Sequence, residues 1–154
     1  MQMENRELLI RVEKWFRENV GNMGIDDIDR VIEKSAAILG KISGNEKFRK
    51  EVEKVRVLLR MLRDYRTGEY RNVPWHTIAA IGLALLYILL PLDLIPDVLP
   101  VIGLTDDIAM FFLVWKMVNE DVREYVRWKC GADTIDNDFR ELISGIFGEE
   151  ECIT

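Results

Sequence analysis

Hydrophobic side chains recur every three or four residues along much of this chain, which is the spacing of one face of an α-helix. The pattern predicts amphipathic helices over residues 4–20, about 26–39 and 46–66, with charged residues filling the opposite faces. Glycines follow the first two stretches, and Asn45 stands where it can cap the third. We therefore expect three ordinary surface helices in the first half of the chain.

The pattern changes after residue 75. The stretch TIAAIGLALLYILLPL, residues 77–92, has no charge and no polar face, and such a helix is buried on all sides or lies in lipid. Three prolines between 91 and 100 exclude a continuous helix there. The sequence Thr-Asp-Asp at 105–107 then favours the start of a further helix that runs to about residue 130. The pattern thus predicts an apolar helical hairpin over 75–118.

A short last helix is predicted to begin at Asp136 or Asp138. It carries Phe139, Leu142 and Ile143 on one face. No stretch shows the alternation of a strand. The predicted fold is all-α: a single helical domain over residues 1–154, built as a compact bundle of five long helices plus a short C-terminal helix, with the apolar hairpin at its centre.

Acidic residues gather at the tip of the predicted hairpin. The segment PLDLIPDVLPVIGLTDD, residues 91–107, holds Asp93, Asp97, Asp106 and Asp107 and no basic residue. We expect these carboxylates to accept hydrogen bonds from free backbone amides at helix starts and turns. The alternative is a site for Mg²⁺, Mn²⁺ or Ca²⁺, which prefer oxygen ligands, although the spacing does not match an EF-hand loop.

A third possibility for the aspartates is pairing with arginines. Residues 45–71 hold nine basic and five acidic side chains, whereas residues 77–107 hold four aspartates and no base. The arginines concerned are Arg60, Arg63, Arg66 and Arg71. Charge complementarity would then join the third helix to the tip of the hairpin.

The overall charge limits the classes of function. The formal net charge is −6, so we expect no nucleic-acid partner, because such binding depends on neutralising phosphates. No catalytic motif or cofactor-binding motif is present. His76, the only histidine, is expected at the surface or at a helix start. Cys130 and Cys152 fit no metal spacing, and we expect no disulfide scaffold and hence a cytoplasmic location.

One segment resembles a known family. Residues 64–129, and above all the motif from Pro91 to Asp107 with its prolines, Gly103 and paired aspartates, look like the YkvA-like family, catalogued as domain of unknown function 1232. The resemblance implies no established activity. Some relatives place this segment in a membrane, so the resemblance keeps a membrane location open.

The residues themselves also leave the membrane question open. The uncharged run 77–92 covers roughly 24 Å as a helix, which is shorter than a hydrocarbon core of about 30 Å. The basic residues on both sides nevertheless suit a multi-pass hairpin with both ends cytoplasmic. We expect a non-enzymatic scaffold or interaction module, either free in the cytoplasm or associated with a membrane or a membrane-protein partner, and able to form a homo-oligomer. The alternative is a metal-binding or metal-dependent module that uses the aspartates.

Overall fold

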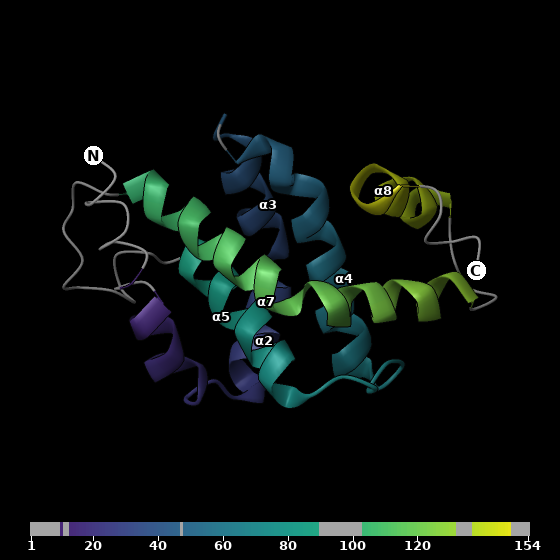
Figure 1. The fold of residues 1–154 in the computed structure, drawn as a ribbon, viewed down its shortest axis with the longest axis horizontal. Helices are drawn as coiled ribbons and strands as arrows, with labels where there is room; N and C mark the ends of the chain where they lie inside the picture. Colours follow the sequence, from purple (N-terminus) through teal and green to yellow (C-terminus); the bar gives the residue numbers. More distant parts are fainter. Residues whose placement is uncertain (1–9, 11–12, 47, 90–102, 132–136, 149–154) are drawn as a thin grey trace.

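The computed structural model describes residues 10, 13–46, 48–89, 103–131 and 137–148. All the regular elements within these ranges are helical, which confirms the all-α fold class. Residues 13–20 are helical, and the further elements are α2 (Ile25–Glu33), α3 (Ser35–Ser43), the short 3-10 helix η1 (Arg49–Glu51), α4 (Val52–Thr67), α5 (Trp75–Leu89), α7 (Gly103–Gly131) and α8 (Asn137–Phe147). Figure 1 shows how they are arranged.

The second predicted helix is two helices. The chain leaves helical geometry at Lys34, with φ −96° and ψ 16°, and α3 then continues through Gly40 to Ser43. Our prediction of one helix ending near residue 39 was therefore wrong. The break gives each short helix its own buried face, and both α2 and α3 contact α4 and α5. Apolar spacing continued through the break, so periodicity alone did not reveal it.

The third predicted helix begins with a tighter turn than expected. The backbone carbonyl of Asn45 accepts hydrogen bonds from the N–H groups of Phe48 and Arg49, at 3.1 and 2.9 Å. The 3-10 helix η1 follows, and regular α-helix starts at Val52. Short 3-10 turns are common at helix ends, so the predicted start was a few residues early for the α-helix itself.

The apolar helix α5 is the core of the bundle. All twelve residues from 77 to 88 are buried, and α5 contacts α2, α3, α4 and α7. Gly82 allows the closest approach: a Cβ atom placed there would lie 2.5 Å from Cδ1 of Ile28 on α2. Protein side chains therefore cover this helix on every side, as expected for a helix that has no polar face.

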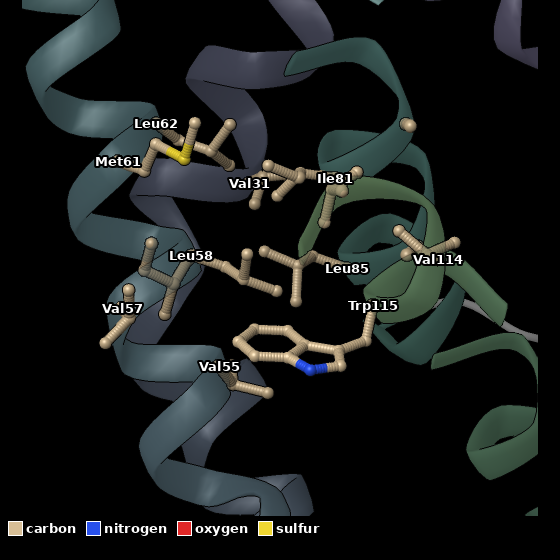
Figure 2. Close-up of a cluster of buried hydrophobic side chains, with 14 of the residues drawn as sticks. Val31, Val55, Val57, Leu58, Met61, Leu62, Ile81, Leu85, Val114 and Trp115 are labelled. Carbon is tan, nitrogen blue, oxygen red and sulfur yellow. The ribbon is translucent and has the colours of Figure 1, made fainter. Parts of the chain in front are cut away.

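Side chains from α5 and from three other helices meet in the core. In Figure 2, Val31 of α2, Leu58 of α4, Ile81 and Leu85 of α5 and Trp115 of α7 lie together in the centre of the molecule. Each of these is a large apolar side chain, and burying one contributes roughly 1.5–3 kcal/mol. The apolar faces of the amphipathic helices thus pack against α5, as their hydrophobic patterns predicted.

A glycine turn reverses the chain between α4 and α5. Gly68 has φ +90°, in the left-handed region that favours glycine. The N–H of Gly68 donates to the carbonyl of Tyr65, and the N–H of Tyr70 donates to the carbonyl of Asp64. Pro74 precedes the first residue of α5 and supplies the first carbonyl acceptor of that helix. The turn brings Tyr70 back against the end of α4.

The last helix packs along α4. It buries Phe139 and Ile143, and the guanidinium of Arg60 on α4 lies over the Phe139 ring at 5.1 Å. Further along, Gly145 leaves room for the carboxylate of Glu53. Because residue 139 is beside 60 and residue 145 is beside 53, α8 runs antiparallel to α4. This element confirms the predicted short C-terminal helix.

Candidate functional site

The predicted aspartate site lies mostly outside the described residues. Asp93 and Asp97 fall in the range 90–102, and the side chains of Asp106 and Asp107 are likewise outside the described part of the chain. α7 begins at Gly103, two residues before the predicted start, so Asp106 and Asp107 are its fourth and fifth residues. The metal site, the capping role and the turn role therefore all stay predictions.

The described residues offer no alternative metal centre. Within them, no three side chains of His, Cys, Asp or Glu come together in a way that could hold an ion. His76 is exposed at the start of α5, which agrees with its expected surface position. Cys130, near the end of α7, is disulfide-bonded, whereas the sequence led us to expect no disulfide scaffold and, for that reason, a cytoplasmic location.

The arginines proposed as partners of the aspartates have other contacts. Arg66 donates two hydrogen bonds to the carboxylate of Asp29 on α2, at 2.6 and 3.2 Å. Arg63 donates to the Ser35 hydroxyl at 2.9 Å. Arg71 lies over the Tyr65 ring at 5.5 Å. These arginines join α4 to α2, to α3 and to the turn. Their pairing with the aspartates of the hairpin tip stays a prediction, because the side chains of those aspartates lie outside the described residues.

The most developed polar cluster joins α4 to α7. Asp64 Oδ2 accepts hydrogen bonds from the Tyr125 hydroxyl at 2.6 Å and from Lys129 Nζ at 2.9 Å. Asp64 and Lys129 each have only 13% of their side-chain surface exposed. We call Asp64, Tyr125 and Lys129 the Asp64 cluster. A carboxylate with two donors in a partly buried site is a charge-assisted network of the strong kind.

Burial shapes the protonation of the cluster. Burial raises the pKa of Tyr125 far above its usual value near 10, and the hydrogen bond to Asp64 and the charge of that residue raise it further. Tyr125 therefore stays a neutral hydrogen-bond donor. Burial also raises the pKa of neighbouring Tyr70, and the charges of Glu124 and Asp121 add to the shift. The protonated Tyr125 hydroxyl donates its hydrogen bond to the Asp64 carboxylate.

Aromatic rings enclose the Asp64 cluster. The Tyr70 ring packs against Tyr125 and Trp128, with centroids 5.1 and 4.9 Å apart. Phe139 of α8 meets the edge of Tyr125 at 6.1 Å. Four elements thus converge on one tyrosine. Sequence reasoning missed the cluster, and the available signal was weak: Asp64 follows Met61 by three residues, on a helix that buries most of its apolar positions.

A second polar contact joins α5 to α7. The buried Thr77 hydroxyl lies 2.5 Å from Oδ2 of Asp121. The Thr77 side chain is buried in the described structure, and Asp121 satisfies its hydroxyl. Like the Asp64 cluster, the pair fixes the position of one helix against another.

A third polar contact, an ion pair, lies where α4 begins. Glu51 is buried, and its Oε2 lies 2.9 Å from Lys54 Nζ. The same ammonium lies 5.2 Å from the Trp115 ring centre and 5.9 Å from that of Phe112. Cation–π contact of this kind compensates part of the desolvation of a lysine. It ties the start of α4 to α7.

A groove of about 570 Å³ runs between α3, α4 and α8. Its lining contains three leucines, Leu39, Leu59 and Leu142, together with charged side chains. Basic residues come from α4 and acidic ones from α4 and α8 in equal number. The groove therefore has no net charge that would select an anion or a cation.

Polar side chains in these described contacts thus hold helices together. Each of the pairs Asp64–Tyr125, Thr77–Asp121 and Arg66–Asp29 connects two elements far apart in sequence. Within the described residues, none of the helices is both long enough and apolar enough to cross a bilayer. The arrangement can support recognition of a partner by the outer surface of a rigid bundle.

Comparison with known proteins places the chain in a family. Residues 77–113 match the family described as "Protein of unknown function (DUF1232)". A relative from Bacillus subtilis (strain 168), named "Uncharacterized membrane protein YkvA", is 35% identical over 101 residues, covering 62% of this chain and 95% of the relative. No solved structure matches. The chain therefore belongs to the YkvA-like family, the proteins of unknown function grouped as DUF1232.

Proposed function

We propose that the protein is a non-enzymatic helical interaction module that associates with a membrane as a folded bundle. The burial of α5 carries the proposal. A helix with an uncharged run of this kind could enter lipid, but here residues 77–88 are covered by other helices. Attachment that left this fold intact would have to use the outer surface of the bundle.

The relative supplies the membrane part of the proposal. Its printed name is that of an uncharacterised membrane protein, and this chain covers 95% of it. The described polar contacts supply the non-enzymatic part, because Asp64, Tyr125, Thr77 and Asp121 are engaged in joining helices. These residues hold the helices in position, so we expect exposed side chains to recognise the partner.

Fractionation tests the proposal. The full chain, expressed with a small tag in bacteria, is expected in the membrane pellet and is expected to leave it on washing with 1 M salt. In Triton X-114 phase separation it is expected in the aqueous phase. Recovery of the chain in the supernatant would refute the proposed membrane association. A chain that resists salt and enters the detergent phase would show that the hairpin inserts and that the bundle does not persist.

A matched variant links the test to the fold. Replacing Leu85 in the core of α5 by Asp buries a charge among apolar side chains, which costs several kcal/mol. If membrane binding needs the folded bundle, Leu85→Asp loses both its cooperative melting and its pellet fraction. Arg17→Gln, an exposed change on the first helix, serves as the control and keeps both. Retention of membrane binding by unfolded Leu85→Asp would contradict the role of the bundle.

A further inference from the structure

Two tryptophans are half-exposed at places where helices end. Trp75 is the first residue of α5 and has 38% of its surface exposed, and Trp128, three residues before the end of α7, has 39% exposed. Tryptophan is usually well buried in folded proteins. Each of the two packs one side against tyrosine rings and still has more than a third of its surface exposed to solvent.

Both tryptophans belong to one end of the bundle. The Trp75 ring lies 6.2 Å from that of Tyr65, and the Trp128 ring lies 4.9 Å from that of Tyr70. The turn between α4 and α5 holds the two tyrosines together, because Tyr70 donates its N–H to the carbonyl next to Tyr65, that of Asp64. Figure 1 shows this turn and the second half of α7 on the same side of the molecule.

Basic side chains accompany these rings. Arg71 is exposed and lies over Tyr65 at 5.5 Å, and Arg127 is exposed next to Trp128. Among the exposed charged side chains of the segments 60–76 and 121–131, four are basic (Arg63, Arg66, Arg71 and Arg127) and two are acidic (Glu69 and Glu124), in a chain whose net charge is −6. We call Tyr65, Arg71, Trp75, Arg127 and Trp128, together with Tyr70 buried behind Trp128, the aromatic end.

This composition fits the boundary between water and a bilayer. Tryptophan and tyrosine place an apolar ring toward acyl chains and a polar edge toward headgroups. Arginine next to them is attracted to anionic headgroups. The opposite charge balance of the rest of the chain would keep other faces away from such a surface.

We propose that the aromatic end is the surface through which the folded bundle contacts an anionic bilayer. The inference rests on the proposed function and adds the site and the class of partner to it. Trp75 and Trp128 enter the headgroup layer, and Arg71 and Arg127 meet anionic lipid. The helix α5 remains in the core, with its N-terminal residue at the membrane surface.

Vesicle flotation with the full chain tests the tryptophans. The chain is mixed with vesicles of phosphatidylcholine containing phosphatidylglycerol, and the bound fraction is measured against lipid concentration. The double variant Trp75→Ala, Trp128→Ala is expected to bind roughly tenfold more weakly or worse, since each indole loses the burial of exposed apolar surface. The control Phe112→Ala, Met117→Ala removes two exposed apolar side chains from the first half of α7 and is expected to bind like the wild type.

Fluorescence gives a readout that does not depend on alanine variants folding. Brominated lipids quench only indoles at bilayer depth, so they are expected to quench part of the wild-type emission. Each of Trp75→Phe and Trp128→Phe is expected to lose a share of that quenching. Quenching that stays unchanged in both variants would overturn the assignment of this surface.

A charge variant tests the choice of lipid. Arg71→Gln with Arg127→Gln is expected to lose most of the preference for vesicles with phosphatidylglycerol over pure phosphatidylcholine. Lys41→Gln with Lys50→Gln, two exposed changes near the opposite end of α4, is expected to keep it. Equal loss in both pairs would overturn the site.

The outcomes separate the two proposals. Wild-type binding that neither the tryptophan pair nor the arginine pair weakens would refute the aromatic end while the membrane association stands. Wild-type protein that floats with neither vesicle type, but pellets with cell membranes, would refute lipid as the partner and leave a membrane protein. Wild-type protein that binds no membrane in either assay would refute both proposals.

Discussion

The Asp64 cluster allows a single oxygen atom to be tested. Tyr125→Phe removes the hydroxyl that donates to Asp64 at 2.6 Å. The phenyl ring keeps the packing of the tyrosine ring against Tyr70 and Phe139. The change therefore isolates one hydrogen bond in a site where four elements meet.

The magnitude follows from what remains after the change. A hydrogen bond to a charged group contributes about 1.5–3 kcal/mol. Asp64 keeps Lys129 at 2.9 Å, so the carboxylate does not become the unpaired buried charge whose cost is about 3–5 kcal/mol. We expect Tyr125→Phe to lower the free energy of unfolding by about 2 kcal/mol. For a chain of this size that corresponds to a fall in Tm of roughly 4–8 °C.

Urea and thermal unfolding followed by far-UV circular dichroism measure the effect. Tyr65→Phe is the matched control, because the Tyr65 hydroxyl makes no hydrogen bond within the described residues while its ring contacts Trp75. We expect the control to stay within about 0.5 kcal/mol of the wild type. Adding Lys129→Met completes a double-mutant cycle, which should show coupling of at least about 0.5 kcal/mol. If Tyr125→Phe and Tyr65→Phe unfolded alike, the cluster would not stabilise the fold and the reasoning would fail.

Three further predictions concern other parts of the molecule. Because the folded-state pKa of Tyr125 is raised, its stabilising contribution is complete below about pH 10 and falls as the pH rises above that. Between pH 10 and 11 the free energy of unfolding of the wild type should therefore fall more steeply than that of Tyr125→Phe, by about 1.4 kcal/mol per pH unit. Parallel curves for the two proteins from pH 9 to 11 would contradict the shift. Gly82→Leu should lower the free energy of unfolding by about 2 kcal/mol or more, because the new side chain overpacks against Ile28. Gly82→Ala should change the free energy of unfolding by less than about 1 kcal/mol, because a gain in helix propensity opposes the close contact. Equal melting temperatures of the two variants would show that α2 moves aside without cost. Calorimetric titration with Mg²⁺, Mn²⁺ and Ca²⁺ tests the predicted hairpin-tip site: if it exists, Asp93→Asn and Asp97→Asn abolish binding, and a wild-type chain that binds no cation eliminates it.

Much of the fold could be predicted from periodicity. The charged faces of the amphipathic helices and the polar-free stretch 77–92 predicted which apolar surfaces had to pack together. The turn that the prolines predict over 91–100 lies outside the described residues. The break at Lys34 could not be predicted in this way, because apolar residues on both sides keep helical spacing. A helix can change direction without any change in that pattern when each half buries its own residues.

The polar contacts were harder to predict than the helices. Asp64 and Tyr125 are 61 residues apart, and Thr77 and Asp121 are 44 apart. Nothing in the local sequence of either partner distinguishes a residue that binds across the bundle from one that faces solvent. Such pairs become visible only when the crossing of α4 and α5 with α7 is known. Arg66 shows the same difficulty, since nothing in its local sequence indicated that it would bind Asp29 on α2, 37 residues away.

The environment of α5 shows why apolar composition alone could not decide between lipid and protein. Its described end residues differ from its middle: Trp75 is half-exposed, Thr77 contacts Asp121, and only then do buried apolar residues follow. Gly82 is placed where α2 comes closest, so at least one small residue on this helix is explained by a specific protein neighbour. A helix surrounded by lipid alone would make neither the hydrogen bond to Asp121 on α7 nor the close contact of Gly82 with Ile28. These two contacts, more than its hydrophobicity, are the reason to expect α5 to stay inside the bundle when the protein meets a membrane, and to look for membrane contact at its exposed N-terminal tryptophan.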